Sequence, residues 1–248
     1  MVFHSRSLLP ALPLLLAACG ATERTSADRL AATGELVAMS GGDAGAAYAC
    51  IACHGVDGRG NGAGTPRLAG LNQGYLEAQL EAYGDGRRAH PEMHAIARKL
   101  RPEQRQAVSA YYARLGFAYP AAAGAPEPAA AALYQQGDSA RGLAPCASCH
   151  GPNGEGDGGG NPPLAGQPAP YLAEQLAQWR RSARRSDGGN VMLAISRRLS
   201  PAQSAALARY AAGLPGGPPR PVSPAAFPAA HRGDPRNDAS TRPLYEAE

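Results

Sequence analysis

Two copies of one five-residue motif give this chain of 248 residues its most distinctive chemistry. Each copy reads C-x-x-C-H: Cys50, Cys53 and His54, then Cys146, Cys149 and His150. Two thiols at this spacing add across the two vinyl groups of one porphyrin, and the adjacent imidazole becomes a ligand of the iron. The motifs therefore predict two covalently attached haem c groups, each anchored by two cysteines and ligated by one histidine.

Three other roles are known for closely spaced cysteines: a thioredoxin-like redox pair, a zinc knuckle and a structural disulfide. A redox pair does not need the histidine, and zinc would require further Cys or His ligands nearby. The chain has five cysteines, and the two motifs use all of them except Cys19. Because the motif occurs twice with similar flanks, haem attachment is the favoured interpretation.

The residue opposite the histidine decides what a haem iron does. Met93 and Met192 follow the motif histidines by 39 and 42 residues, at matching places in the two halves. A thioether is a soft, neutral ligand that favours ferrous iron and raises the reduction potential. We expect both methionines to be axial ligands, so that both irons are six-coordinate and closed.

Histidines near Met93 are the competing ligands in the first half. His90 and His94 flank it, whereas the second half has no histidine between His150 and His231. Symmetry favours methionine in both halves, and we expect His90 and His94 to be solvated loop residues. Met39 has no methionine at the matching place in the second half, and we expect it to fill the core.

A proline follows each motif histidine by twelve residues, Pro66 in the first half and Pro162 in the second. A backbone carbonyl at such a place accepts the second imidazole N–H, which fixes the tautomer and the plane of the ring. A simple turn proline is the alternative, and the two interpretations are compatible.

The composition limits the kind of protein this is. Gly 31, Pro 23 and only 6% aromatic residues leave two small domains with little bulk, which a buried haem in each would supply. The net charge of +4 is offset by haem propionates, and no basic run is interleaved with aromatics, so nucleic acid is not an expected partner. One cluster of arginines is expected to form a solvated face: Arg180, Arg181, Arg184 and Arg185. Docking of an acidic partner and pairing with the haem propionates are the alternatives.

The N-terminus reads as an export segment. A short apolar run ends in Leu16-Ala17-Ala18-Cys19-Gly20, which resembles a bacterial lipobox. This predicts a lipoprotein signal peptide over residues 1–18, lipidation of Cys19 and a tether over 19–29, which places the protein in the periplasm on a lipid anchor. An ordinary signal peptide cut near Ala21 is the alternative.

The flanks of the motifs match at an offset of 96 residues and, after an insertion near 186–190, at 99. This tandem duplication predicts domains over 30–118 and 129–213, a linker over 119–128, and a Pro-rich disordered tail over 214–248.

Each unit should be helical: a leading helix, a brief helix ending in the motif, a Gly-rich loop, an amphipathic helix, a loop carrying the methionine, and a last helix. The last helices should begin at Pro102 and Pro201, with Ser200 as a cap. No segment alternates with a period of two, so no sheet is expected.

The order of these motifs resembles the two-haem cytochrome c4 family. C-x-x-C-H-G, P-x-L-A-G, Y-L-x-x-Q-L and a methionine before I-x-x-x-L appear in both halves over about residues 30–213. The resemblance implies an all-α fold of two tandem class I cytochrome c domains, each wrapped around one haem c, that pass electrons towards terminal oxidases. It also implies the axial pairs His54/Met93 and His150/Met192. Two departures are Leu71, where the second half has the family's usual glutamine (Gln167), and the long tail.

The predicted function is that of a membrane-tethered dihaem electron carrier without substrate chemistry of its own. Its expected partners are redox proteins: a quinol-oxidising complex, a terminal oxidase or a periplasmic dehydrogenase. The alternatives are the electron-accepting subunit of a periplasmic dehydrogenase or reductase, a two-haem peroxidase, and a gas-binding sensor.

Overall fold

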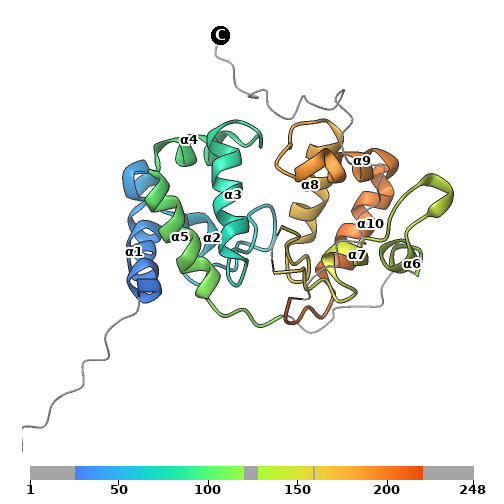
Figure 1. Ribbon diagram of the computed structural model, residues 1–248, viewed down its shortest axis with the longest axis horizontal. Helices are drawn as coiled ribbons and strands as arrows, with labels where there is room; N and C mark the ends of the chain where they lie inside the picture. Colours follow the sequence, from blue (N-terminus) through green and yellow to red (C-terminus); the bar gives the residue numbers. More distant parts are fainter. Residues whose placement is uncertain (1–25, 120–127, 159, 220–248) are drawn as a thin grey trace, which may run out of the picture.

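The computed structural model describes residues 26–119, 128–158 and 160–219, which form two helical bundles side by side (Figure 1). The signal segment, Cys19, most of the predicted linker and most of the tail lie outside the described residues. Domain 1 contains α1 (Ser26–Ser40), α2 (Cys50–His54), α3 (Gln73–Gly84), α4 (Pro91–Lys99) and α5 (Pro102–Arg114). Domain 2 contains α6 (Pro128–Gln136), α7 (Ala147–His150), α8 (Ala169–Arg180), α9 (Val191–Arg198) and α10 (Pro201–Ala212).

The helices of the two domains correspond one to one, which agrees with a duplicated unit. Within the described ranges there is no β-strand, and only two isolated bridges join extended residues, Arg88 with Arg184 and Asp138 with Leu143. The all-α prediction is therefore confirmed. No single helix in these ranges is long and apolar enough to cross a membrane, although one pair bent by 118°, Thr33–Ala44 with Ala46–His54, reaches that length and composition together.

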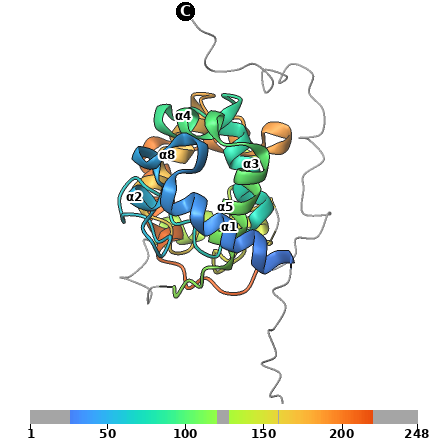
Figure 2. The ribbon, with the colours of Figure 1, turned by 90° about the vertical axis from the view of Figure 1, so that its left-hand side faces the viewer.

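The first and last helices of domain 1 cross at close range. Helix α1 lies across α5 (Figure 2), and Val37 and Ala38 of α1 share a buried cluster with Val108 and Tyr112 of α5. Gly34 lies at the crossing, where an added Cβ would fall on the backbone of Ala107. The absence of a side chain at this position therefore sets how closely the two helices approach.

The core of domain 2 extends beyond the predicted boundary at residue 213. Tyr134 of α6 packs with Leu207 and Ala211 of α10, and Leu214 joins the same cluster with 7% of its surface exposed. The amide of Gly216 also donates to the carbonyl of Asn153 at 2.8 Å. The prediction that the tail begins at 214 and buries no core is wrong for these first residues, because Leu214 completes the cluster under the Gly-rich loop.

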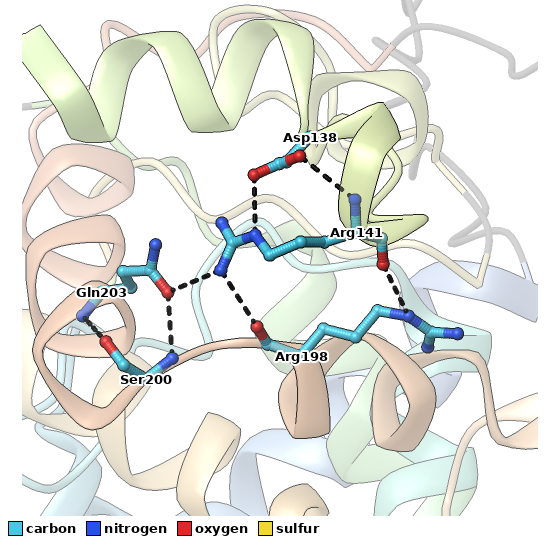
Figure 3. Close-up of polar contacts among 5 residues, drawn as sticks. All are labelled: Asp138, Arg141, Arg198, Ser200 and Gln203. Atoms are coloured by element: carbon cyan, nitrogen blue, oxygen red, sulfur yellow. Dashed lines mark hydrogen bonds and ion pairs between the residues drawn. The ribbon is translucent and has the colours of Figure 1, made fainter.

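A polar network ties the turn before the second motif to the start of α10 (Figure 3). Arg141 donates to Asp138 Oδ2 at 2.6 Å and to Gln203 Oε1 at 3.3 Å, and Arg198 donates to the carbonyl of Arg141. Ser200 caps α10 as predicted, since its hydroxyl accepts from the amide of Gln203 at 3.1 Å. These contacts fix the segment that leads into the motif helix α7.

The matching turn of domain 1 is tied to α5 by different side chains. Gln104 Nε2 donates to Asp43 Oδ1 at 2.9 Å, and Arg101 Nε donates to Asp43 Oδ2 at 2.8 Å. The two domains therefore hold the chain before each motif in the same way, by joining it to the first turn of the last helix.

Two predicted element boundaries need correction. Helix α1 begins at Ser26, earlier than the expected start near residue 30, and Pro128 begins α6. The predicted loop carrying the methionine is a helix in both domains: Met93 lies in the first turn of α4 and Met192 in the first turn of α9.

Replacing Gly34 with alanine tests the helix crossing. We expect the Gly34→Ala protein to lose about 1–3 kcal/mol of unfolding free energy, because the new methyl group would force α1 away from α5. Leu36→Ala is the control on the same helix, since Leu36 is 70% exposed and its truncation should cost under about 0.5 kcal/mol. Denaturant unfolding of the holoprotein measures both, and equal stabilities would contradict this account of the crossing.

Candidate haem sites

Each C-x-x-C-H motif forms a short helix that presents its cysteines and histidine together. Cys50 begins α2 and His54 ends it, and in domain 2 His150 ends α7, with Cys146 as its N-cap. A glycine with positive φ follows each histidine, Gly55 at 79° and Gly151 at 79°. The left-handed turn stops the helix at the histidine and sends the chain into the Gly-rich loop.

The orientation of each motif histidine is fixed by a proline carbonyl. His54 Nδ1 lies 3.0 Å from the carbonyl oxygen of Pro66, and His150 Nδ1 lies 2.9 Å from that of Pro162. A carbonyl only accepts, so Nδ1 carries the proton in both rings and Nε2 keeps its lone pair. Each imidazole thus offers the nitrogen that a metal ligand requires.

The environment also keeps both imidazoles neutral. Burial lowers the pKa of His54, with a further contribution from nearby His90. Burial is also the main cause that lowers the pKa of His150, and the positive charge of Arg184 acts in the same direction. A neutral imidazole at physiological pH is the form that binds iron.

The motif thiols are not arranged for redox or zinc chemistry. None of the four cysteines is in a disulfide, and burial raises the pKa of Cys50 and of Cys146 to about 11, which keeps these thiols protonated at neutral pH. A reactive redox cysteine has the opposite shift. Within the described residues, no group of three or more His, Cys, Asp or Glu side chains is placed to hold a metal ion, so a zinc knuckle has no ligand set there.

A cavity of about 1040 Å³ in domain 2 gathers the predicted ligands around one space. Its lining includes Cys146, Cys149, His150 and Met192, and apolar side chains of α8 and α10. The volume lies just above the usual range for ligand pockets, about 300–1,000 Å³, as a large planar cofactor requires. Two thiols, one neutral imidazole and one thioether facing a single large space fit a covalently anchored haem.

The cavity also reaches into the other domain. Leu71, Tyr75 and Gln79, which belong to domain 1, form part of its lining. A group bound by domain 2 would therefore contact domain 1 directly.

Met192 is held in place by a half-buried acidic residue that sequence reasoning missed. The carboxylate of Asp187 accepts from the backbone amide of Met192 and from Trp179 Nε1, each at 2.8 Å. Burial raises the pKa of Asp187, while these hydrogen bonds and the charge of Arg184 oppose the rise. Asp187 lies in the insertion that distinguishes domain 2, and no periodicity in the sequence marked it.

In domain 1 a histidine occupies the corresponding place. His90 is the N-cap of α4, and its Nδ1 accepts from the amide of Met93 at 3.3 Å. His94 is half-buried within α4, where its Nδ1 lies 2.7 Å from the carbonyl of Tyr83. The expectation of two solvated loop residues is wrong for His94, because the segment is helical and turns this ring towards α3.

Two further expectations about side-chain burial are wrong. Met39 does not fill the core, since 43% of its surface is exposed. Arg184 and Arg185 are not on a solvated face, with 3% and 8% of their surfaces exposed, whereas Arg181 remains at the surface and pairs with Glu174. The arginines are close together in the sequence, but in the structure Arg184 and Arg185 are buried and Arg181 is exposed.

Comparison with known proteins supports the duplicated architecture. A family model described as cytochrome c matches residues 42–115 and 132–214, one match for each domain. The thiosulfate dehydrogenase electron acceptor of Stutzerimonas stutzeri strain A1501 is 40% identical over 188 residues, which cover 74% of this chain and 87% of that protein.

Solved structures give the same result. Reduced recombinant cytochrome c4 from Pseudomonas stutzeri superposes with a TM-score of 0.63 at 31% identity. The match covers 74% of this chain and 97% of the cytochrome c4 chain. Thiosulfate dehydrogenase TsdBA from Marichromatium purpuratum superposes with a TM-score of 0.66 at 39% identity, and covers 75% of this chain. This chain spans 40% of the length of that protein. Two tandem cytochrome c domains imply two covalently bound haem c groups, as the motifs predicted.

Substitution of Asp187 tests the electrostatics of the domain 2 cavity. A negative charge near a haem stabilises the ferric state, so Asp187→Asn should raise one of the two reduction potentials and leave the other unchanged. Spectroelectrochemical titration measures both potentials. Glu174→Gln is the control, because it removes an exposed carboxylate of the same domain that solvent screens. Two unchanged potentials in the Asp187→Asn protein would contradict this assignment.

Proposed function

The chain belongs to the cytochrome c family, in its two-haem cytochrome c4-like group, and on this premise we propose that it carries single electrons from a periplasmic dehydrogenase towards a terminal oxidase. Electron transfer by a dihaem cytochrome c is common to the group. The identity of the donor, the direction and the residue roles below are the parts proposed here. The cavity of domain 2, where one complete ligand set lines a single space, is the observation that carries the proposal.

We assign the haem-binding roles residue by residue. Cys50 and Cys53 would anchor the haem of domain 1, and His54 and Met93 would ligate its iron. In domain 2 the anchors would be Cys146 and Cys149, and the ligands would be His150 and Met192. The carbonyls of Pro66 and Pro162 are the hydrogen-bond acceptors that orient the two imidazoles.

The assignment of Met93 rests on its place in the duplicated unit. Met93 lies in the first turn of α4, and Met192, which lines the domain 2 cavity, lies in the first turn of the corresponding helix α9. His90 Nδ1 accepts from the amide of Met93, as the carboxylate of Asp187 accepts from the amide of Met192.

Each haem iron, when bound, supplies a site that stores one electron by cycling between ferric and ferrous states. The protein contributes a fixed coordination sphere. The Pro66 and Pro162 carbonyls hold the rings in place, and the neutral thioethers favour the ferrous state. With histidine and methionine both bound to each iron, no position would remain for a substrate, so the chain would transfer electrons without substrate chemistry of its own. A two-haem peroxidase would instead need one iron with an open position.

The names of similar proteins guide the choice of donor. Relatives from two organisms, 40% and 38% identical to this chain, are thiosulfate dehydrogenase electron acceptors. We therefore favour a thiosulfate-oxidising dehydrogenase as the donor, and this agrees with the alternative of an electron-accepting subunit. A quinol-oxidising complex is the second candidate donor, since relatives named cytochrome c4 are also present at 36% identity.

The location follows from the same group, whose members are periplasmic c-type cytochromes. We propose that a lipid on Cys19 tethers the protein to a membrane, which would keep the carrier close to membrane-bound acceptors. The lipobox-like sequence around Cys19 supports this anchor.

Reduction by a thiosulfate-oxidising dehydrogenase tests the proposed function. The oxidised holoprotein is mixed with thiosulfate alone and with thiosulfate plus a catalytic amount of the dehydrogenase. We expect reduction of both haems only when the enzyme is present, followed in the visible spectrum. Reduction by thiosulfate alone would contradict the absence of substrate chemistry. No reduction with the enzyme, together with fast reduction by a quinol-oxidising complex, would replace the proposed donor by the second candidate.

A further inference from the structure

The Gly-rich loop that follows each motif is closed by one short polar side chain. In domain 1 this is Asn61, whose Oδ1 accepts from the backbone amides of Ala63 and Thr65, each at 3.0 Å. In domain 2 the residue at the repeat offset is Asp157, whose Oδ1 accepts from the amide of Asn161 at 3.1 Å. Thr65 and Asn161 match at the same offset. The same hydrogen bond therefore closes both loops, through an amide oxygen in one domain and a carboxylate in the other.

The closing hydrogen bond also holds the carbonyl that orients the motif imidazole. Thr65 immediately precedes Pro66, and Asn161 immediately precedes Pro162. Because the residue before each proline is fixed, the proline carbonyl that binds the histidine is fixed with it. An amide oxygen performs this task in domain 1, so the negative charge of Asp157 is not needed to build the loop.

The carboxylate of Asp157 faces the space that a haem of domain 2 would occupy. Asp157 and Asn161 line the cavity together with Cys149 and His150. The Asp157 side chain is half-buried, and its Oδ2 accepts from Asn161 Nδ2 at 2.7 Å, which fixes its position. Solvent screens a half-buried charge less than an exposed one, so this carboxylate acts on the groups around the cavity.

The charge of Asp157 is felt at both neighbouring groups of the motif. Burial is the largest influence on the pKa of His150 and lowers it, whereas the charge of Asp157 acts in the opposite direction. Burial raises the pKa of Cys149, and Asp157 adds to that rise. Both effects have the sign expected of a negative charge, which favours an imidazolium and disfavours a thiolate. A haem attached at Cys149 and bound by His150 would lie in the same field.

The loop of domain 1 brings no comparable charge to its motif. Asn61 is exposed and uncharged. The one acidic residue in the loop over 55–64 is Asp57, which pairs with Arg59 at 2.8 Å, and both side chains are 55% exposed. The paired cation and the surrounding water screen this carboxylate. The two loops therefore share a hydrogen-bonding role and differ in electrostatics.

We propose that Asp157 is a positioning residue whose negative charge lowers the reduction potential of the haem of domain 2. The proposal rests on the ligation of that haem by His150, which is part of the proposed function. Ferric haem carries one more positive charge than ferrous haem, so a negative charge beside it favours the ferric state. Asp157 holds the loop as Asn61 does and adds a charge that Asn61 lacks, which makes the two haem sites unequal.

Exchange of the loop-closing side chains tests the proposal. Asp157→Asn gives the domain 2 loop the closing residue of domain 1, and it should raise one reduction potential and leave the other unchanged. Adding Asn161→Asp to this variant returns a carboxylate to the same hydrogen-bonded pair and should restore the lower potential. Asn61→Asp should lower the other potential, by a smaller amount because Asn61 is exposed. Spectroelectrochemical titration measures both potentials in each protein.

Asp57→Asn is the matched control, because it removes an exposed, paired carboxylate from the equivalent loop. This variant should leave both potentials unchanged. A haem count and the far-red band of methionine-bound ferric iron, read on the same samples, report attachment and ligation separately from the charge effect.

The proposal is overturned if Asp157→Asn keeps two haems and the far-red band but leaves both potentials unchanged. It is also overturned if this variant shifts both potentials equally, or if the added Asn161→Asp restores nothing. Fewer than two haems in the unmodified protein would instead overturn the proposed function and this proposal with it, and the haem count shows that before any potential is measured.

Discussion

The hydrogen bond between each motif imidazole and a proline carbonyl is the constraint on which the rest of the structure depends. Once Nδ1 is bound to Pro66 or Pro162, the ring has one available nitrogen, and burial keeps that nitrogen unprotonated. A buried, neutral, fixed imidazole is poorly explained by packing alone. It is well explained by an iron, and the short motif helices, glycine turns and loops all serve to bring histidine and proline to this distance.

The duplication supplies two such sites, and contacts across the domain boundary connect the two domains. The cavity of domain 2 includes side chains of domain 1, and buried arginines cross the boundary in both directions. Arg67 adds a third crossing: its guanidinium is fully buried, donates to the carbonyl of Ala165 at 3.0 Å and lies over Phe117. Burial lowers the pKa of Arg67 to about 10, which still leaves it charged at neutral pH. An interface this polar is stable only when its buried polar groups have hydrogen-bond partners, and here side chains of each domain supply partners to the other.

Much of this could be predicted from the sequence, because local rules govern it. The C-x-x-C-H motifs, the matched prolines, the Ser200 cap and the repeat offset depend on residues close in the chain or on exact repetition. The first turns of α4 and α9 were missed because both helices are short, with nine and eight residues, and neither has the Glu or Gln of a capping box at its third position. The burial of Arg184 and Leu214 was missed for another reason. Both contact residues far away in sequence, and a charge run or a proline-rich stretch suggests exposure when only its neighbours are considered.

The optical spectrum of the oxidised holoprotein, with a pyridine haemochrome count, tests the central claim most directly. The account predicts two haems per chain and the far-red band of methionine bound to ferric iron. That band should weaken in Met93→Ala and in Met192→Ala and persist in Met39→Ala, since Met39 is 43% exposed and outside the cavity lining. Two haems with a high-spin spectrum in the unmodified protein would contradict it, because an open iron position belongs to a peroxidase or a gas-binding protein rather than to a closed electron carrier.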